Sequence, residues 1–140
     1  MSPHSYANWQ EGQDIIAGIN DGTYVNCSAG YTDWRLPNRK ELHSLTDFSQ
    51  FNPAMPQGHP FVNVEPSPPG FYYQTSTTCA NSTGSFWGIN IGNGKIINAQ
   101  KLSAVNWVWP VRGGLSGNGS SGGGSGGGCF IGATADVISK

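Results

Sequence analysis

The amino-acid sequence predicts an α+β domain in which two helices pack on a twisted antiparallel sheet with long Pro-rich loops. Three observations favour this class. Apolar residues recur at helical spacing near the N-terminus, six prolines fall within residues 49–70, and apolar and polar residues alternate after residue 71. We therefore expect the order helix, helix, long irregular loop and strands.

The first helix is expected over residues 6–20, because four apolar side chains fall close to one face at helical spacing. These side chains belong to Tyr6, Trp9, Ile16 and Ile19. The second helix is expected to begin near Asn38, a good N-cap residue, with Glu41 in the capping-box position three residues later. Pro37 prevents an earlier helical start.

Strands are expected in four segments that alternate and are rich in aromatic and β-branched residues. The segments are residues 71–78, 85–91, 95–99 and 105–112. The Gly-Asn-Gly sequence at 92–94 is typical of a hairpin turn. Alternation places Trp87, Ile89 and Ile91 on one face of their strand and Phe86, Gly88 and Asn90 on the other. In the last segment Val105, Trp107, Trp109 and Val111 alternate with Asn106, Val108 and Pro110.

Composition divides the chain into three parts. Residues 1–112 are expected to form the folded domain. Residues 113–128 contain ten Gly and four Ser, which is typical of a flexible linker. Residues 129–140, "CFIGATADVISK", form a short apolar tail.

Charge and hydropathy exclude several kinds of partner. Charged residues make up 11% of the chain and the net charge is −1, with no basic run, so we expect no nucleic-acid partner. No apolar stretch approaches the roughly 20 residues of a membrane-spanning helix. The first ten residues, "MSPHSYANWQ", show no visible signal peptide.

The cysteine and histidine residues suggest no metal site and no cofactor. The three cysteines are Cys27, Cys79 and Cys129, an odd number without zinc-binding spacing. A Cys27–Cys79 disulfide and two free thiols both remain open. The three histidines, His4, His43 and His59, are scattered along the chain.

The segment "AGYTDWRLPNRKEL", residues 29–42, gathers bulky and charged residues where a loop meets a helix. We expect Trp34 and Leu36 to be buried and Arg35 to pair with a carboxylate, either Asp47 or Glu41, because buried charges are normally paired. The segment is therefore interpreted as a structural motif. Its members are Trp34, Arg35, Leu36, Pro37, Glu41 and Asp47.

This motif, the later "YYQTSTT" and "FWGINIGNGKI" segments and the closing "VWPVRGG" resemble the Lcl C-terminal domain family over roughly residues 5–114. The resemblance implies a C-type-lectin-like fold, similar to that of formylglycine-generating enzymes. The sheet region also resembles the variable proteins of diversity-generating retroelements, which implies diversified surface positions within residues 79–106. The copper-binding cysteine pair of the enzymes is missing, and residues 79–106 contain no Asp or Glu for a calcium site.

The expected function is therefore that of a non-catalytic ligand-binding module, lectin-like or receptor-binding, outside the cell or on its surface. Its partner would be a protein or a carbohydrate, bound by aromatic and amide side chains within residues 73–107. The predicted ligand-binding residues are Tyr73, Gln74, Phe86, Asn90, Asn98, Gln100, Asn106 and Trp107. Two alternatives remain: a structural subunit of an extracellular assembly or filament that self-assembles through the C-terminal tail, and an enzyme of unknown type.

Overall fold

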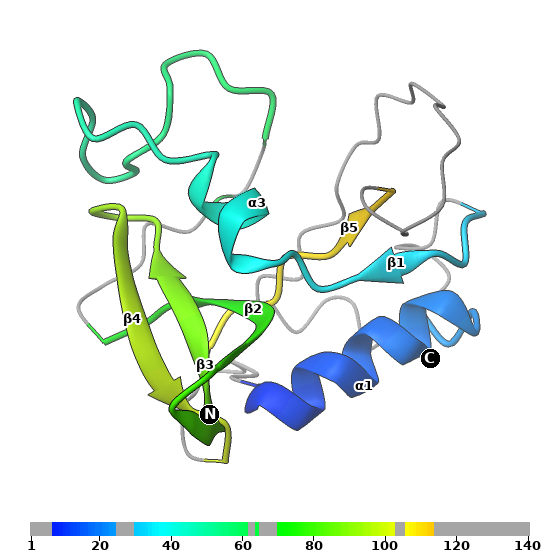
Figure 1. Cartoon of the computed structure of the whole chain (residues 1–140). Helices are drawn as coiled ribbons and strands as arrows, with labels where there is room; N and C mark the ends of the chain where they lie inside the picture. Colours follow the sequence, from blue (N-terminus) through cyan, green and yellow to red (C-terminus); the bar gives the residue numbers. More distant parts are fainter. Residues whose placement is uncertain (1–6, 25–29, 62–63, 65–69, 103–105, 114–140) are drawn as a thin grey trace, which may run out of the picture.

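The structure, a computed structural model, describes residues 7–24, 30–61, 64, 70–102 and 106–113. Two helices and two antiparallel sheets confirm the α+β class (Figure 1). The elements in chain order are α1 (Trp9–Asn20), β1 (Trp34–Arg35), α3 (Arg39–His43), β2 (Tyr73–Cys79), β3 (Ser82–Asn90), β4 (Lys95–Gln100) and β5 (Val111–Arg112).

Both helices begin at an Asn residue that closes a capping box. The Asn38 side chain accepts a hydrogen bond from the Glu41 N–H at 2.9 Å, and the Asn38 N–H donates to the Glu41 carboxylate at 2.8 Å. This confirms the predicted start of the second helix. Asn8 and Glu11 form the same arrangement at 3.0 and 2.7 Å. The first helix therefore begins at Trp9 rather than at residue 6, because Asn8 caps it.

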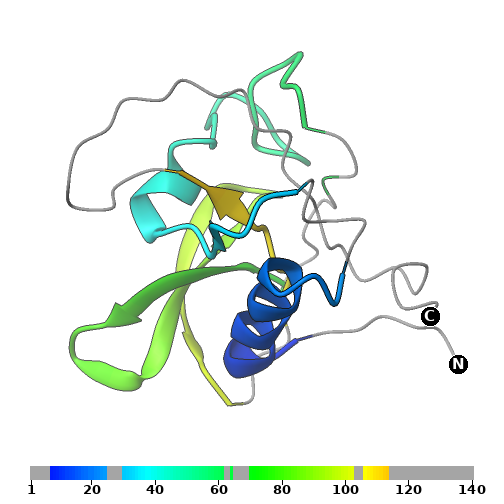
Figure 2. The same cartoon turned by 90° about the vertical axis from the view of Figure 1, so that its right-hand side faces the viewer.

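The larger sheet has the strand order β2–β3–β4, and the smaller one pairs β1 with β5. β3 and β4 form a continuous antiparallel hairpin in which Trp87 pairs with Asn98. β2 and β3 pair less regularly, with register shifts after Gln74 and after Thr78. Figure 2 shows α1 next to β2, with the larger sheet extending away from it.

The predicted single strand over residues 105–112 is wrong. Asn106 forms an isolated bridge with Ala7, and Trp107 forms a parallel bridge with Tyr73. The chain then leaves this sheet and pairs with β1 through β5. Pro110 lies between the two pairings and has no N–H to donate to a ladder, which explains the break. Residue 105 lies outside the described residues.

The core consists of two clusters of buried side chains. One contains Leu42, Met55, Tyr73, Ile89, Ile91, Trp107 and Trp109. The other contains Ala7, Ile16, Ile19, Trp34, Leu36 and Val108. Residues 107–109 thus alternate between the two clusters, so this segment holds the two halves of the domain together.

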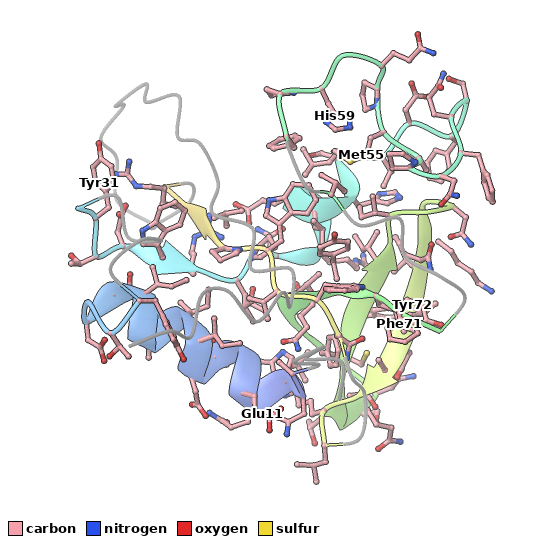
Figure 3. The ribbon with its side chains drawn as sticks, turned by 180° about the vertical axis from the view of Figure 1, so that it is seen from behind. Glu11, Tyr31, Met55, His59, Phe71 and Tyr72 are labelled. Carbon is pink, nitrogen blue, oxygen red and sulfur yellow. The ribbon has the colours of Figure 1, made fainter. Side chains whose placement is uncertain are left out.

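The Pro-rich loop forms no helix or strand in its described residues. Backbone hydrogen bonds nevertheless fix it to the turn between β3 and β4. Asn52 donates to the Gly92 carbonyl at 2.8 Å and Ala54 to the Ile91 carbonyl at 2.7 Å. Met55 of this loop is buried in the core cluster with Leu42 and Ile91, and in the view of Figure 3 it lies near His59. Residues 62–63 and 65–69 lie outside the described residues.

Candidate functional site

The Trp-Arg-Leu-Pro segment is a buried junction, as predicted. Trp34 is 4% exposed and Leu36 is 2% exposed. The guanidinium of Arg35 donates to both carboxylate oxygens of Glu41, at 2.8 and 2.7 Å. It also donates to the Gly113 carbonyl. Arg35 therefore has its donors occupied by the protein itself.

The acidic partner of Arg35 is Glu41 and not Asp47. The Asp47 carboxylate accepts hydrogen bonds from the backbone N–H and the hydroxyl of Ser49, at 2.9 and 2.7 Å. The hydrogen bond from Arg35 is the main cause that lowers the pKa of Glu41. Burial raises this pKa in part, and the hydrogen bond from the Asn38 N–H lowers it again. The junction is thus a satisfied structural network and offers little to a ligand.

Most of the predicted ligand-binding face is not exposed, which corrects the sequence-based expectation. The buried side chains are Tyr73 (2% exposed), Gln74 (0%), Phe86 (0%), Asn90 (3%), Asn106 (2%) and Trp107 (9%). Side chains this deeply buried cannot form a surface that recognises another molecule.

The physical reason is that the strands are covered on both faces. The Tyr73 ring packs against Trp107 and Trp109, with centroid distances of 6.4 and 5.3 Å. The next side chain, Gln74, points the other way and donates to the Ala7 and Asn8 carbonyls at 2.8 and 3.1 Å. Alternation therefore separates two buried faces here, and neither face of β2 is exposed at Tyr73 and Gln74.

Two of the predicted residues are exposed, and both lie on β4. Asn98 pairs directly with Trp87, and Gln100 pairs with Ser85. Directly opposed residues in an antiparallel pair share a face, as do residues two apart along a strand. Asn98 and Gln100 therefore lie on the same face of the sheet as Trp87.

An open hollow lies on this face, between α3 and the β2–β3 hairpin, with a volume of about 570 Å³. We call it the Trp87 hollow. From α3 and its cap it is lined by Asn38, Arg39 and Lys40, and from the hairpin by Thr77, Thr78, Ala80, Asn81 and Trp87. Trp87 lies on the same strand face as the buried Ile89 and Ile91, but its own side chain is only partly buried.

Arg39, one of the residues that line the hollow, is held by two contacts. Its backbone N–H donates to the Thr77 hydroxyl at 2.9 Å. Its guanidinium carbon lies 5.1 Å from the centroid of the Trp87 ring, a cation–π geometry. Lys40 is exposed beside it. The basic pair that directly follows the cap residue Asn38 is the feature of the sequence that indicates this site.

The charge on this face is positive although the whole chain carries −1. Among the described residues the ion pairs are Arg35–Glu41 and Arg112–Asp33, so neither involves Arg39 or Lys40. Residues 71–102 contain no Asp or Glu. The ammonium group of Lys101 donates to the hydroxyl of Thr78, a hollow-lining residue, at 2.9 Å.

The described residues include no group of three or more His, Cys, Asp or Glu that would hold a metal ion. Cys79 is a buried free thiol. Burial raises its pKa, and the nearby positive charges of Arg39 and Lys101 lower it by a smaller amount. His43 packs edge-on against Phe48 at 5.7 Å. His4, Cys27 and Cys129 lie outside the described residues.

No helix in the described part of the chain is long and apolar enough to cross a bilayer.

A family model described as the Lcl C-terminal domain matches residues 2–112. No curated protein and no solved structure matches the chain.

Proposed function

The chain belongs to the Lcl C-terminal domain family, and we propose that it is a non-catalytic binding module that holds an anionic carbohydrate in the Trp87 hollow. We further propose that its fold is C-type-lectin-like, as the family resemblance implies, and that it works outside the cell or on the cell surface as an adhesion module.

One observation carries the proposal: two cations and an aromatic ring line the hollow, and none of the described residues that line it is a carboxylate. Arg39 and Lys40 contribute a formal charge of two, and the nearest acid on the same helix, Glu41, is bound by Arg35. An unpaired guanidinium can bind a carboxylate or sulfate through two parallel hydrogen bonds. Such a bond draws Arg39 away from the indole and uncovers a flat apolar surface.

The surrounding residues suit a sugar better than a simple inorganic anion. Trp87 offers a ring face. The exposed amides of Asn81, which lines the hollow, and of Asn98, which pairs with Trp87 on β4, can bind hydroxyl groups. The volume, about 570 Å³, falls within the range of about 300–1,000 Å³ that is usual for small-molecule sites. Because the hollow is open, an extended polysaccharide can pass through it.

The test compares three polymers with the same glucan backbone: neutral dextran, carboxymethyl dextran and dextran sulfate. We expect calorimetric binding to the two anionic polymers, weakening as salt rises, and none to neutral dextran. The difference in affinity between carboxymethyl dextran and dextran sulfate identifies the preferred anion. Equal binding to all three, or to none, would contradict the proposal.

Variants locate the binding site. The double variant Arg39→Gln/Lys40→Gln should weaken binding about tenfold or more, because each charged hydrogen bond contributes about 1.5–3 kcal/mol. The separate variant Trp87→Ala should also weaken polymer binding, but it should leave the salt dependence of that binding unchanged. Lys95→Gln removes one exposed charge outside the hollow and is the matched control. If this control weakens binding as much as the double variant, the anion binds by general attraction and not in the hollow.

The resemblance to variable proteins of diversity-generating retroelements leads to a related proposal, that exposed positions within residues 79–106 are diversified. Its support is that Ala80, Asn81, Thr83 and Asn98 are exposed between buried framework residues. Comparison of the codons for residues 73–107 with any near-copy of that DNA tests it. Mismatches limited to adenines are expected, and mismatches spread over all bases would exclude it.

A further inference from the structure

The open edge of the larger sheet is a second interaction surface, separate from the Trp87 hollow. β3 lies between β2 and β4, so one long side of β4 has no strand beside it among the described residues. All six residues from Lys95 to Gln100 pair with β3 without a register shift. The edge therefore carries neither the bulge nor the proline that usually prevents a further strand from pairing.

The side chains along this edge can cover an added strand on both of its faces. Ile96 is partly buried against the core cluster of Leu42 and Tyr73. Ile97 lies on the opposite face, where its Cδ1 atom approaches Gly88 next to Tyr72. A strand with apolar residues on alternating sides would thus find apolar neighbours as well as free backbone groups.

We propose that residues 129–138 of this chain occupy the edge as an additional strand, in the same molecule or in a neighbouring copy. This segment, "CFIGATADVI", is rich in the β-branched and aromatic residues that favour strands. Its only charged residue is Asp136, whereas β4 begins at Lys95 and is followed by Lys101, with no acid in residues 71–102. The charges of the segment and of the edge are therefore complementary.

The connecting residues are long enough for this pairing. Residues 114–128 are mostly Gly and Ser, and a linker of this composition and length spans about 20–25 Å on average. A domain of this size has a radius of gyration of about 13 Å. The tail can therefore reach β4 from the end of β5 or bridge to a second molecule.

Amide-resolved hydrogen exchange by NMR on the full chain tests the proposal. In an edge strand alternate amides bond to the neighbouring strand and the others exchange freely, whereas in an interior strand all are protected. We expect all amides of residues 96–100 to be protected in the full chain. Ile131→Pro or Val137→Pro, which remove donors from the tail and leave the domain intact, should make alternate amides exchange at least tenfold faster.

Ser120→Pro, placed in the linker, is the matched control and should leave the protection unchanged. Protection that is independent of protein concentration assigns the added strand to the same chain, and protection lost on dilution assigns it to a neighbouring copy; both support the proposal. If alternate β4 amides exchange freely in the full chain, or if the tail variants change nothing, the proposal is wrong. Because polymer binding is measured separately, this result is independent of the function proposed for the hollow.

Discussion

Arg35 and Glu41 form a two-point ion pair, with Nη1 2.8 Å from Oε2 and Nη2 2.7 Å from Oε1. Arg35 belongs to β1 and Glu41 to the first turn of α3, so the pair fixes the angle at which the chain enters the helix. The same guanidinium binds the Gly113 carbonyl just after β5. Three segments that are distant in sequence are thus joined around one side chain.

Replacing Glu41 with Ala should lower the free energy of unfolding by about 2 kcal/mol. Half of the loss comes from the capping box, at about 1 kcal/mol. The remainder comes from the ion pair, which is worth at most about 1 kcal/mol because both side chains are about one-third exposed. Urea unfolding measures the change. Asp14→Asn, on the exposed surface of α1, is the control and should shift stability by less than about 0.5 kcal/mol. Equal effects of the two variants would refute this account of the junction.

The Arg35–Glu41 pair should also make stability depend on pH. The folded chain lowers the pKa of Glu41, chiefly through the Arg35 hydrogen bond, so this stabilisation is complete above the ordinary value of about 4.3. It is lost as the pH falls through the lowered folded-state pKa. The stability difference between the natural chain and Glu41→Gln should therefore shrink between about pH 6 and about pH 3. A difference that stays constant over this range would mean that Glu41 does not act through its charge.

Sequence reasoning succeeded where the signal was local. Asn38 and Glu41 specify a capping box within one turn, and Trp34 and Leu36 are apolar residues that flank a single Arg. It failed on the question of which strand face is exposed, because the answer depends on α1, which lies far away in sequence. Gln74 appeared to be a surface amide, yet its partners are the Ala7 and Asn8 carbonyls. Trp87 shares its predicted strand face with Ile89 and Ile91, yet it is only partly buried whereas those two are fully buried.

Gly12 tests the packing that buries Gln74. A Cβ atom at position 12 would collide with the Gln74 carboxamide. Although Ala is favoured over Gly in a helix by about 1 kcal/mol, overpacking costs about 1–3 kcal/mol, so Gly12→Ala should destabilise the chain. In a Gln74→Ala background the same substitution should be neutral or stabilising, because the obstructing group is gone. Thermal unfolding of the four proteins in this double-mutant cycle gives the coupling. Additive effects would show that the two residues do not touch.

Cys79 should react slowly with alkylating agents while the chain is folded. Its side chain is 0% exposed, and burial raises the pKa of the thiol, so few reactive thiolates are present. Peptide mass spectrometry after iodoacetamide treatment near pH 8 should show modification at least 100-fold slower in buffer than in concentrated urea. Peptide-level detection separates Cys79 from Cys27 and Cys129. Equal rates in buffer and urea would show that the thiol is accessible in the folded chain.

Two asparagines on the β3–β4 hairpin should differ in how strongly their substitution destabilises the folded chain. Asn90 is 3% exposed, donates to the Phe71 carbonyl at 3.0 Å and accepts from the Asn93 N–H at 3.1 Å. Asn90→Ala should therefore cost about 2 kcal/mol, since it removes two partly buried hydrogen bonds of about 1 kcal/mol each. Asn98 is exposed, and Asn98→Ala should change stability by less than about 0.5 kcal/mol. Urea unfolding distinguishes them, and a costly Asn98 substitution would exclude that position from any diversified binding surface.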